Sequence, residues 1–116
     1  IINQQYLNNK VLNRIAIEND DKNYNINDLL EIYNKTNLPI IYDNLHNFVN
    51  PYNIYYNKRD DNYWINLCNK TWKQKDGRQK IHYSQQNLLS NKKNAHSLNI
   101  DTNIFLEFYN SLSNKK

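Results

Sequence analysis

Three short apolar runs, each containing or ending in residues able to bind a metal ion, stand out along the chain. They cover residues 14–18 (RIAIE), 39–43 (PIIYD) and 79–83 (QKIHY). β-Branched and aromatic side chains in runs of this length favour strands over helices. We therefore predict a strand at each of these ranges.

Helical patterns lie between the predicted strands. Asn25 can cap a helix that carries Asp28 in its first turn, presents an apolar face and ends near Thr36. A second helix is expected over residues 63–72, followed by a turn at residues 76–77, which hold the only glycine.

The last part of the chain predicts a long loop and a helix. The polar segment 84–99 is the candidate for a long functional loop, and a helix capped by Asp101 or Thr102 should run through Leu112. Alternating strands and helices are typical of parallel βαβ units, so the predicted fold class is α/β.

The strand ends carry a candidate metal site. Glu18 closes the first run, Asp43 closes the second with His46 three residues later, and Lys80 and His82 lie in the third. In sheets and barrels built from βα units, ligands collect at the carboxyl ends of the strands. Carboxylates and neutral imidazoles are ligands of Zn, Mn and Fe. Because side chains alternate along a strand, Lys80 and His82 should share one face.

Each of these residues also has a structural explanation when taken alone. A carboxylate after a strand is most often a helix cap or a solvated loop residue, which is the role we expect for Asp20 and Asp21. A single histidine, such as His46 or His82, is more often a hydrogen-bonded packing residue than a ligand. The hypothesis of a shared site therefore depends on all five candidates falling at strand ends.

Composition changes this picture little. Asparagine, isoleucine, lysine and tyrosine, whose codons are rich in A and T, make up 60 of the 116 residues. Because codon bias supplies lysine, the net charge of +4 is weak support for a nucleic-acid partner. The single cysteine, Cys68, excludes an internal disulfide and indicates an intracellular rather than a secreted protein; we expect it to pack within a helix. No apolar run approaches the ~20 residues of a membrane span.

The length fits at most one domain of about 100–150 residues. The sequence has no methionine and starts at Ile1. We therefore expect it to be part of a longer chain.

Several of these motifs resemble the UV damage endonuclease family in order and spacing, from about Arg14 to Leu112. The matching segments are residues 18–22 (ENDDK), 25–30 (NINDLL), 38–46 (LPIIYDNLH), 71–72 (TW), 80–84 (KIHYS) and 95–97 (AHS). The resemblance implies a (β/α)8 barrel, of which residues 1–116 would be an incomplete domain. They would supply roughly the fifth to seventh βα units, without the first strands and the last strand.

The resemblance also implies an activity. Family members are DNA repair enzymes of an excision pathway that use divalent metals, typically Mn²⁺, with Zn²⁺ or Mg²⁺ as alternatives. They nick the phosphodiester on the 5′ side of UV photoproducts, including pyrimidine dimers and 6-4 products. The implied partner is UV-damaged double-stranded DNA, and nothing in the sequence indicates a membrane or an obligate protein partner.

The family pattern assigns roles to individual residues. Glu18 would bridge two metals, and Glu18, Lys80 and His82 would form the catalytic group. His96 would contact a metal or a phosphate, whereas His46 is followed by Asn47, where many family members have another histidine. The further metal ligands would be Asp43, His46, His82 and, if its amine is carboxylated, Lys80.

Two other hypotheses stay open. The first is a related barrel enzyme, either an abasic-site endonuclease or a sugar isomerase or epimerase; the abasic-site enzyme should have a carboxylate in place of Lys80. The second is an inactive fragment or binding remnant. Because three βα units cannot close an eight-stranded barrel, we expect the isolated chain to be inactive and either weakly stable or associated, with incomplete metal binding.

Overall fold

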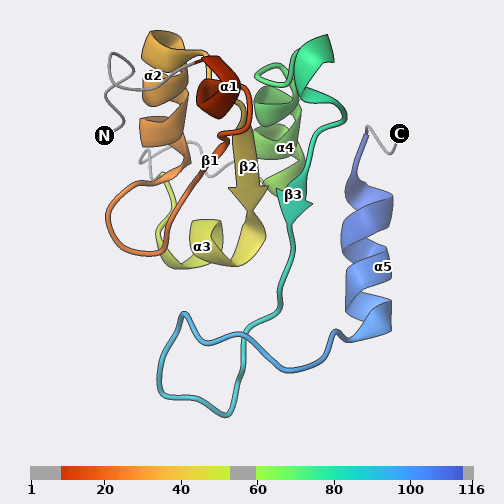
Figure 1. Ribbon diagram of the computed structural model, residues 1–116. Helices are drawn as coiled ribbons and strands as arrows, with labels where there is room; N and C mark the ends of the chain where they lie inside the picture. The colour runs from red at the N-terminus through yellow and green to blue at the C-terminus, as the bar shows by residue number, and fades with distance from the viewer. Residues whose placement is uncertain (1–8, 53–59, 114–116) are drawn as a thin grey trace.

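The computed structural model describes residues 9–52 and 60–113, which form a parallel sheet covered by helices (Figure 1). Strands and helices alternate along most of the chain, as the sequence predicts. The elements are α1 (Asn9–Leu12), β1 (Ile17–Glu18), α2 (Ile26–Thr36), β2 (Ile40–Asp43), α3 (Asn44–Val49), α4 (Asp61–Asn69), the 3₁₀ turn η2 (Gln74–Asp76), β3 (Ile81–His82) and α5 (Thr102–Ser111).

The sheet has the strand order β1-β2-β3, and both neighbouring pairs are parallel. Glu18 pairs with Ile41 in the first ladder, and Asp43 pairs with His82 in the second. The carboxyl ends of the strands therefore meet at one edge of the sheet, as expected for βαβ units.

The outer strands are shorter than the five residues that the sequence predicts. The main-chain N–H of Arg14 donates to the carbonyl of Val11, and that of Ile15 to the carbonyl of Leu12. Because these groups complete the turn after α1, the first ladder begins only at Ile17.

Helices α2 and α4 pack against one face of the sheet (Figure 1). Ile40 and Tyr42 of β2 are fully buried in this core. Since side chains alternate along a strand, Ile41 and Asp43 point to the opposite face. The other buried members of the core are Ile26 and Leu29 of α2, Trp64, Ile65 and Cys68 of α4, and Leu112.

The buried thiol of Cys68 confirms the packing role expected for it. The side chain is fully buried in α4, and burial raises the pKa of the thiol to about 12. A thiol in this environment is unreactive near neutral pH.

The helix caps agree well with the sequence. Asn25 and Asp28 form a reciprocal capping box at α2, and Asp101, not Thr102, caps α5. Helix α4 begins two residues earlier than expected, because Asp60 accepts a hydrogen bond from the backbone N–H of Tyr63. None of the helices within residues 9–52 and 60–113 is long and apolar enough to cross a membrane.

Thr71 and Trp72, expected at the end of that helix, instead bond to the backbone of Ile40 at the start of the central strand, β2. The N–H of Ile40 donates to Oγ1 of Thr71 over 2.9 Å, and Nε1 of Trp72 donates to the Ile40 carbonyl over 2.8 Å. The Thr71 hydroxyl also donates to the Cys68 carbonyl. The two side chains thereby satisfy polar backbone groups at the buried start of β2.

We predict that Thr71→Val lowers the free energy of unfolding by about 1–3 kcal/mol, because it leaves the buried Ile40 N–H without a partner. Urea unfolding of the wild type and the variant measures this difference. The exposed Thr102 provides the matched control, Thr102→Val. Equal unfolding midpoints for wild type and Thr71→Val would contradict the role of the hydroxyl.

The loop after β3 is long, as predicted, and is internally hydrogen-bonded. Gln86 and His96 form an antiparallel bridge, and the Asn87 N–H donates to the Ala95 carbonyl over 2.7 Å. The loop extends past the carboxyl ends of the strands (Figure 1). Its tip leaves Leu88 and Leu89 exposed, at 84% and 97% of their full accessibility.

Candidate metal centre

Glu18, Asp43 and His82 converge at the carboxyl edge of the sheet. Each is the last residue of its strand, and each offers a ligand atom within 4.8 Å of the other two. Nδ1 of His82 lies 2.9 Å from Oε1 of Glu18. Ligand atoms about 2.1 Å from one octahedral ion lie about 3 Å apart, so this spacing suits two ligands of a single metal.

The parallel register explains why these side chains share a face. Asp43 and His82 are direct partners in the ladder between β2 and β3. Glu18 pairs with Ile41, which lies two residues before Asp43 and therefore on the same side of β2. This face is opposite the one that α2 and α4 cover.

Charge at this edge favours a cation. Within residues 9–52 and 60–113, neither Glu18 nor Asp43 forms an ion pair with a lysine or arginine; their partners are His46 and His82. Two carboxylates close together without a permanent positive partner repel each other, and a divalent ion relieves that repulsion. The donor set of two carboxylates and an imidazole also suits Zn, Mn or Fe.

Asp43 has a second role, as the N-cap of α3. Its Oδ1 accepts a hydrogen bond of 2.8 Å from the backbone N–H of His46. Its Oδ2 lies 3.7 Å from the His46 ring. One carboxylate oxygen therefore starts the helix, while the other remains for a metal ion.

His46 lies beside the three-residue group but outside it. Its Nδ1 donates to the Asn19 carbonyl over 2.7 Å and lies 3.7 Å from Oε1 of Glu18. With its proton on Nδ1, the neutral ring keeps a free lone pair on Nε2. Metal-binding histidines commonly use such a carbonyl bond to fix the ring.

The other two candidates, Lys80 and His96, are exposed. Lys80 directly precedes β3, two residues before His82. His96 is exposed in the loop, where its Nδ1 lies 3.1 Å from the Ser97 carbonyl. The structure thus joins three of the candidates and places His46 beside them, with Lys80 directly before β3 and His96 in the loop.

Asp20 has the loop role that the sequence predicts. Its Oδ1 accepts hydrogen bonds from the backbone N–H groups of Lys22, Asn23 and Tyr24. Burial alone would raise the pKa of this carboxyl, but the backbone donors outweigh burial and hold the pKa below its usual 3.8. Asp20 therefore shapes the turn between β1 and α2.

Asn19 is the residue at this edge that sequence reasoning missed. It is fully buried, and its amide bonds to the backbone of Asp43. The sequence offers no signal for this role, because asparagine is the commonest residue in the chain. Only its position directly after Glu18 distinguishes it.

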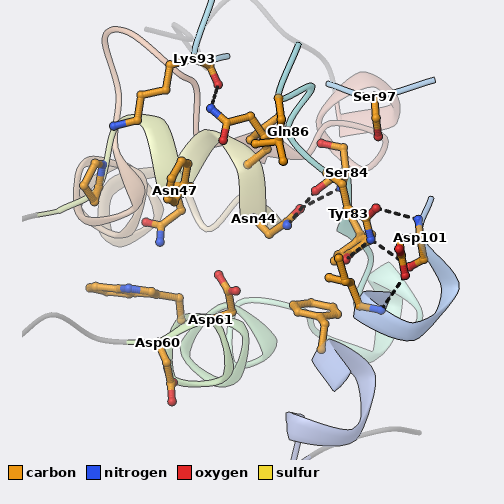
Figure 2. A pocket seen from close by; sticks show the side chains of 18 of the residues that line it. Asn44, Asn47, Asp60, Asp61, Tyr83, Ser84, Gln86, Lys93, Ser97 and Asp101 are labelled. Atoms are coloured by element: carbon orange, nitrogen blue, oxygen red, sulfur yellow. Dashed lines mark hydrogen bonds between the residues drawn. The ribbon is translucent and has the colours of Figure 1, made fainter. Parts of the chain in front are cut away.

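A cavity of about 950 Å³ lies among α3, α4, α5 and the loop after β3 (Figure 2). None of Glu18, Asp43 and His82 lines it. Asn47 of α3 and Asp61 of α4 point into the space between their helices (Figure 2). Asn47 is buried, and its Oδ1 accepts no hydrogen bond from the described part of the chain.

Asp61 should make stability depend on pH. Burial, followed by the nearby charge of Asp60, raises the pKa of the Asp61 carboxyl above its usual 3.8, although the Tyr42 hydroxyl donates a hydrogen bond to it. A carboxyl with a raised pKa in the folded state stabilises the fold while it is protonated. That contribution is lost as pH rises from about 3.8 through the folded-state pKa.

We therefore predict that Asp61→Asn becomes more stable relative to the wild type as pH rises from below 3.8 towards neutrality. The amide oxygen can still accept the Tyr42 bond and cannot ionise. Urea unfolding of both proteins across this range measures the difference. A stability difference that stays constant or changes in the opposite direction contradicts the raised pKa.

Comparison with known proteins decides the family. A sequence profile described as UV-endonuclease UvdE matches residues 1–113. The chain belongs to the UV damage endonuclease family. This confirms the relationship that the sequence motifs indicate.

Two relatives and one solved structure place the chain within this family. The chain is 43% identical over 100 residues to a UV DNA damage endonuclease of Clostridium perfringens, covering 85% of this chain and 23% of that protein. It is 32% identical over 83 residues to a UV-damage endonuclease of Schizosaccharomyces pombe, covering 72% of this chain and 14% of that protein. The chain thus spans at most about a quarter of these two relatives.

The crystal structure of SacUVDE superposes with a TM-score of 0.81 at 32% identity, covering 93% of this chain and 34% of that one. This similarity confirms the predicted fold class: the three βα units of this UV damage endonuclease family member are part of a (β/α)8 barrel. The carboxyl edge of its sheet is thus the edge where barrels of this type carry their active sites.

Proposed function

We propose that this chain supplies metal ligands to a DNA repair endonuclease that nicks the phosphodiester on the 5′ side of UV photoproducts. The convergence of Glu18, Asp43 and His82 at the carboxyl edge of a barrel sheet is the observation that carries the proposal. Family membership supplies the substrate class, because the relatives are named for UV-damaged DNA.

The three residues would hold one or more divalent ions. Mn²⁺ is our first choice because the family resemblance implies it and carboxylates with an imidazole can bind it, with Zn²⁺ or Mg²⁺ as alternatives. A bound divalent ion polarises a phosphoryl oxygen and lowers the pKa of bound water towards neutrality. By the family pattern Glu18 would bridge two ions, and its Oε1 lies 2.9 Å from Nδ1 of His82.

The surrounding residues would complete the site in the whole protein. His46 can add its Nε2, because a carbonyl already holds its Nδ1. Lys80 would add oxygen ligands if its exposed amine is carboxylated, and His96 would contact a metal or a backbone phosphate from the loop. We propose that the active unit is a complete barrel that includes this chain.

The substrate would be double-stranded DNA that carries a UV lesion. Damaged bases are poorly paired and stacked, so less free energy is needed to displace them than intact bases. The loop after β3 extends past the same edge as the metal group and carries Lys92 and Lys93, which can meet phosphate charge.

A nicking assay tests this function. The longest natural polypeptide that contains residues 1–116 is incubated with UV-irradiated, abasic and undamaged plasmids, with and without Mn²⁺. Nicking confined to irradiated plasmid with metal present supports the proposal. Preference for the abasic plasmid would instead indicate an abasic-site endonuclease, and metal-independent nicking would remove the ligand group from the mechanism.

A further inference from the structure

Asn19 has contacts that a buried packing residue does not need. It directly follows Glu18, is fully buried, and uses its side chain and its main chain to bond two different ligand candidates. A buried amide must satisfy its hydrogen-bonding groups, but nothing requires it to do so at the metal-binding edge.

The Asn19 amide extends the ladder between β1 and β2. Its Nδ2 donates to the Asp43 carbonyl over 3.0 Å, and its Oδ1 accepts from the Asp43 N–H over 2.8 Å. Glu18 is the last residue of β1 to pair with β2. The side chain therefore acts as a peptide group beyond the end of that ladder and fixes the backbone of Asp43 beside that of Glu18.

A second contact extends this link to His46. The main-chain carbonyl of Asn19 accepts from Nδ1 of His46 over 2.7 Å, while Oδ1 of Asp43 accepts from the His46 backbone N–H over 2.8 Å. The three residues form a closed ring of hydrogen bonds that joins the residue after β1 to the end of β2 and to α3. A closed ring holds each member more firmly than separate pairs do, because no member can move without breaking a bond to another.

We propose that Asn19 is a positioning residue that sets the separation of Glu18 from Asp43 and the tautomer of His46, and thereby the affinity of the site for a divalent cation. Asn19 does not touch the ion itself. This inference rests on the proposed function, since it assumes that Glu18 and Asp43 bind metal. Beyond that function, it identifies Asn19 as the residue that holds Glu18 and Asp43 in place before an ion binds.

Metal binding to the longest natural polypeptide that contains residues 1–116 tests this inference, with Co²⁺ as a visible-light probe and Mn²⁺ for affinity. Asn19→Asp keeps the shape and loses the donor to the Asp43 carbonyl, and Asn19→Ala loses both bonds. Loss of groups that orient metal ligands typically lowers affinity about 10–100-fold, and we expect that loss here with an altered Co²⁺ absorption spectrum. Asn66→Ala is the matched control, because Asn66 bonds Ser113 away from this edge.

The outcomes are distinct. If the Asn19 variants bind Co²⁺ and Mn²⁺ like the wild type, even with a lower melting temperature, Asn19 is only structural and the inference fails. If Glu18→Gln also binds like the wild type, the proposed metal site fails instead. Nitrogen NMR of the wild type with Zn²⁺ needs no variant: a proton on Nδ1 of His46 supports the inference, and a proton on Nε2 overturns it.

Discussion

Replacing Glu18 by glutamine is expected to reduce metal-dependent nicking of UV-irradiated DNA by about 100-fold or more, because metal ions contribute several kcal/mol to such reactions. Glutamine has the shape of glutamate, and in the metal-free protein its amide oxygen can still accept a hydrogen bond from Nδ1 of His82. The change therefore removes charge from the centre of the ligand group while leaving its packing largely unchanged.

Nicking rate and bound metal are measured on the same preparations of the longest natural polypeptide that contains residues 1–116. The two measurements separate the loss of metal from the loss of activity. Glu31, which is exposed on α2, offers the matched control Glu31→Gln. We expect the Glu18 variant to hold less Mn²⁺ than the control at equal protein concentration. Full metal content together with full activity would exclude Glu18 from the site.

Asp43→Asn is the second substitution for which we expect a large effect, again about 100-fold or more on metal-dependent nicking, as for other losses of a charged metal ligand. Asparagine is as good an N-cap as aspartate, so its oxygen can still accept the hydrogen bond from the His46 N–H and begin α3. The variant therefore loses a negative ligand and keeps the helix start. We expect near wild-type thermal unfolding in the absence of metal and a clear loss of Mn²⁺ affinity.

The matched control for this prediction is Asp101→Asn at the cap of α5, where the aspartate oxygen accepts from the Ile104 N–H. It makes the same chemical change at another helix start, away from the ligands. We expect its metal affinity and nicking rate to equal those of the wild type. A similar loss in both variants would show that the effect comes from the caps and not from the metal site.

Much of the fold could be predicted because local physics determines it. The β-branched runs predicted all three strands, Asn25 predicted the start of α2, and the helix ends at Thr36, before Pro39, as expected. From parallel connections alone, Glu18, Asp43 and His82 could be expected at one edge, and the register confirms this. This prediction does not depend on the family resemblance, because the carboxyl ends of neighbouring parallel strands lie at the same edge of the sheet.

The parts that could not be predicted depend on contacts distant in sequence. Helix α3 has six residues, too few to show a helical period, and it begins inside the motif taken as a metal site. The roles of Asn19 and Thr71 arise from bonds to residues 24 and 31 positions away. The sequence of a polar chain does not show which hydroxyl or amide side chain will bond to a residue distant in sequence.

Helix α4 shows how local and distant effects combine. The sequence predicts its apolar face correctly. The helix starts two residues earlier than predicted because Asp60 caps it. It ends before Thr71 and Trp72, whose side chains bond to Ile40 instead. Polar side chains near a helix end can serve the neighbouring strand instead of the helix. Sequence periodicity does not distinguish a polar residue that belongs to the helix from one that bonds to the neighbouring strand.

The bond between Glu18 and His82 closes a loop of 64 residues. Such closure is entropically unfavourable, so contacts of this kind form late, after the local helices and turns. A metal ion that needs both residues can bind tightly only after β3 has joined the sheet. Its binding free energy then adds to the free energy of folding, so the ion would fasten the first and third strands together as the final step of assembly.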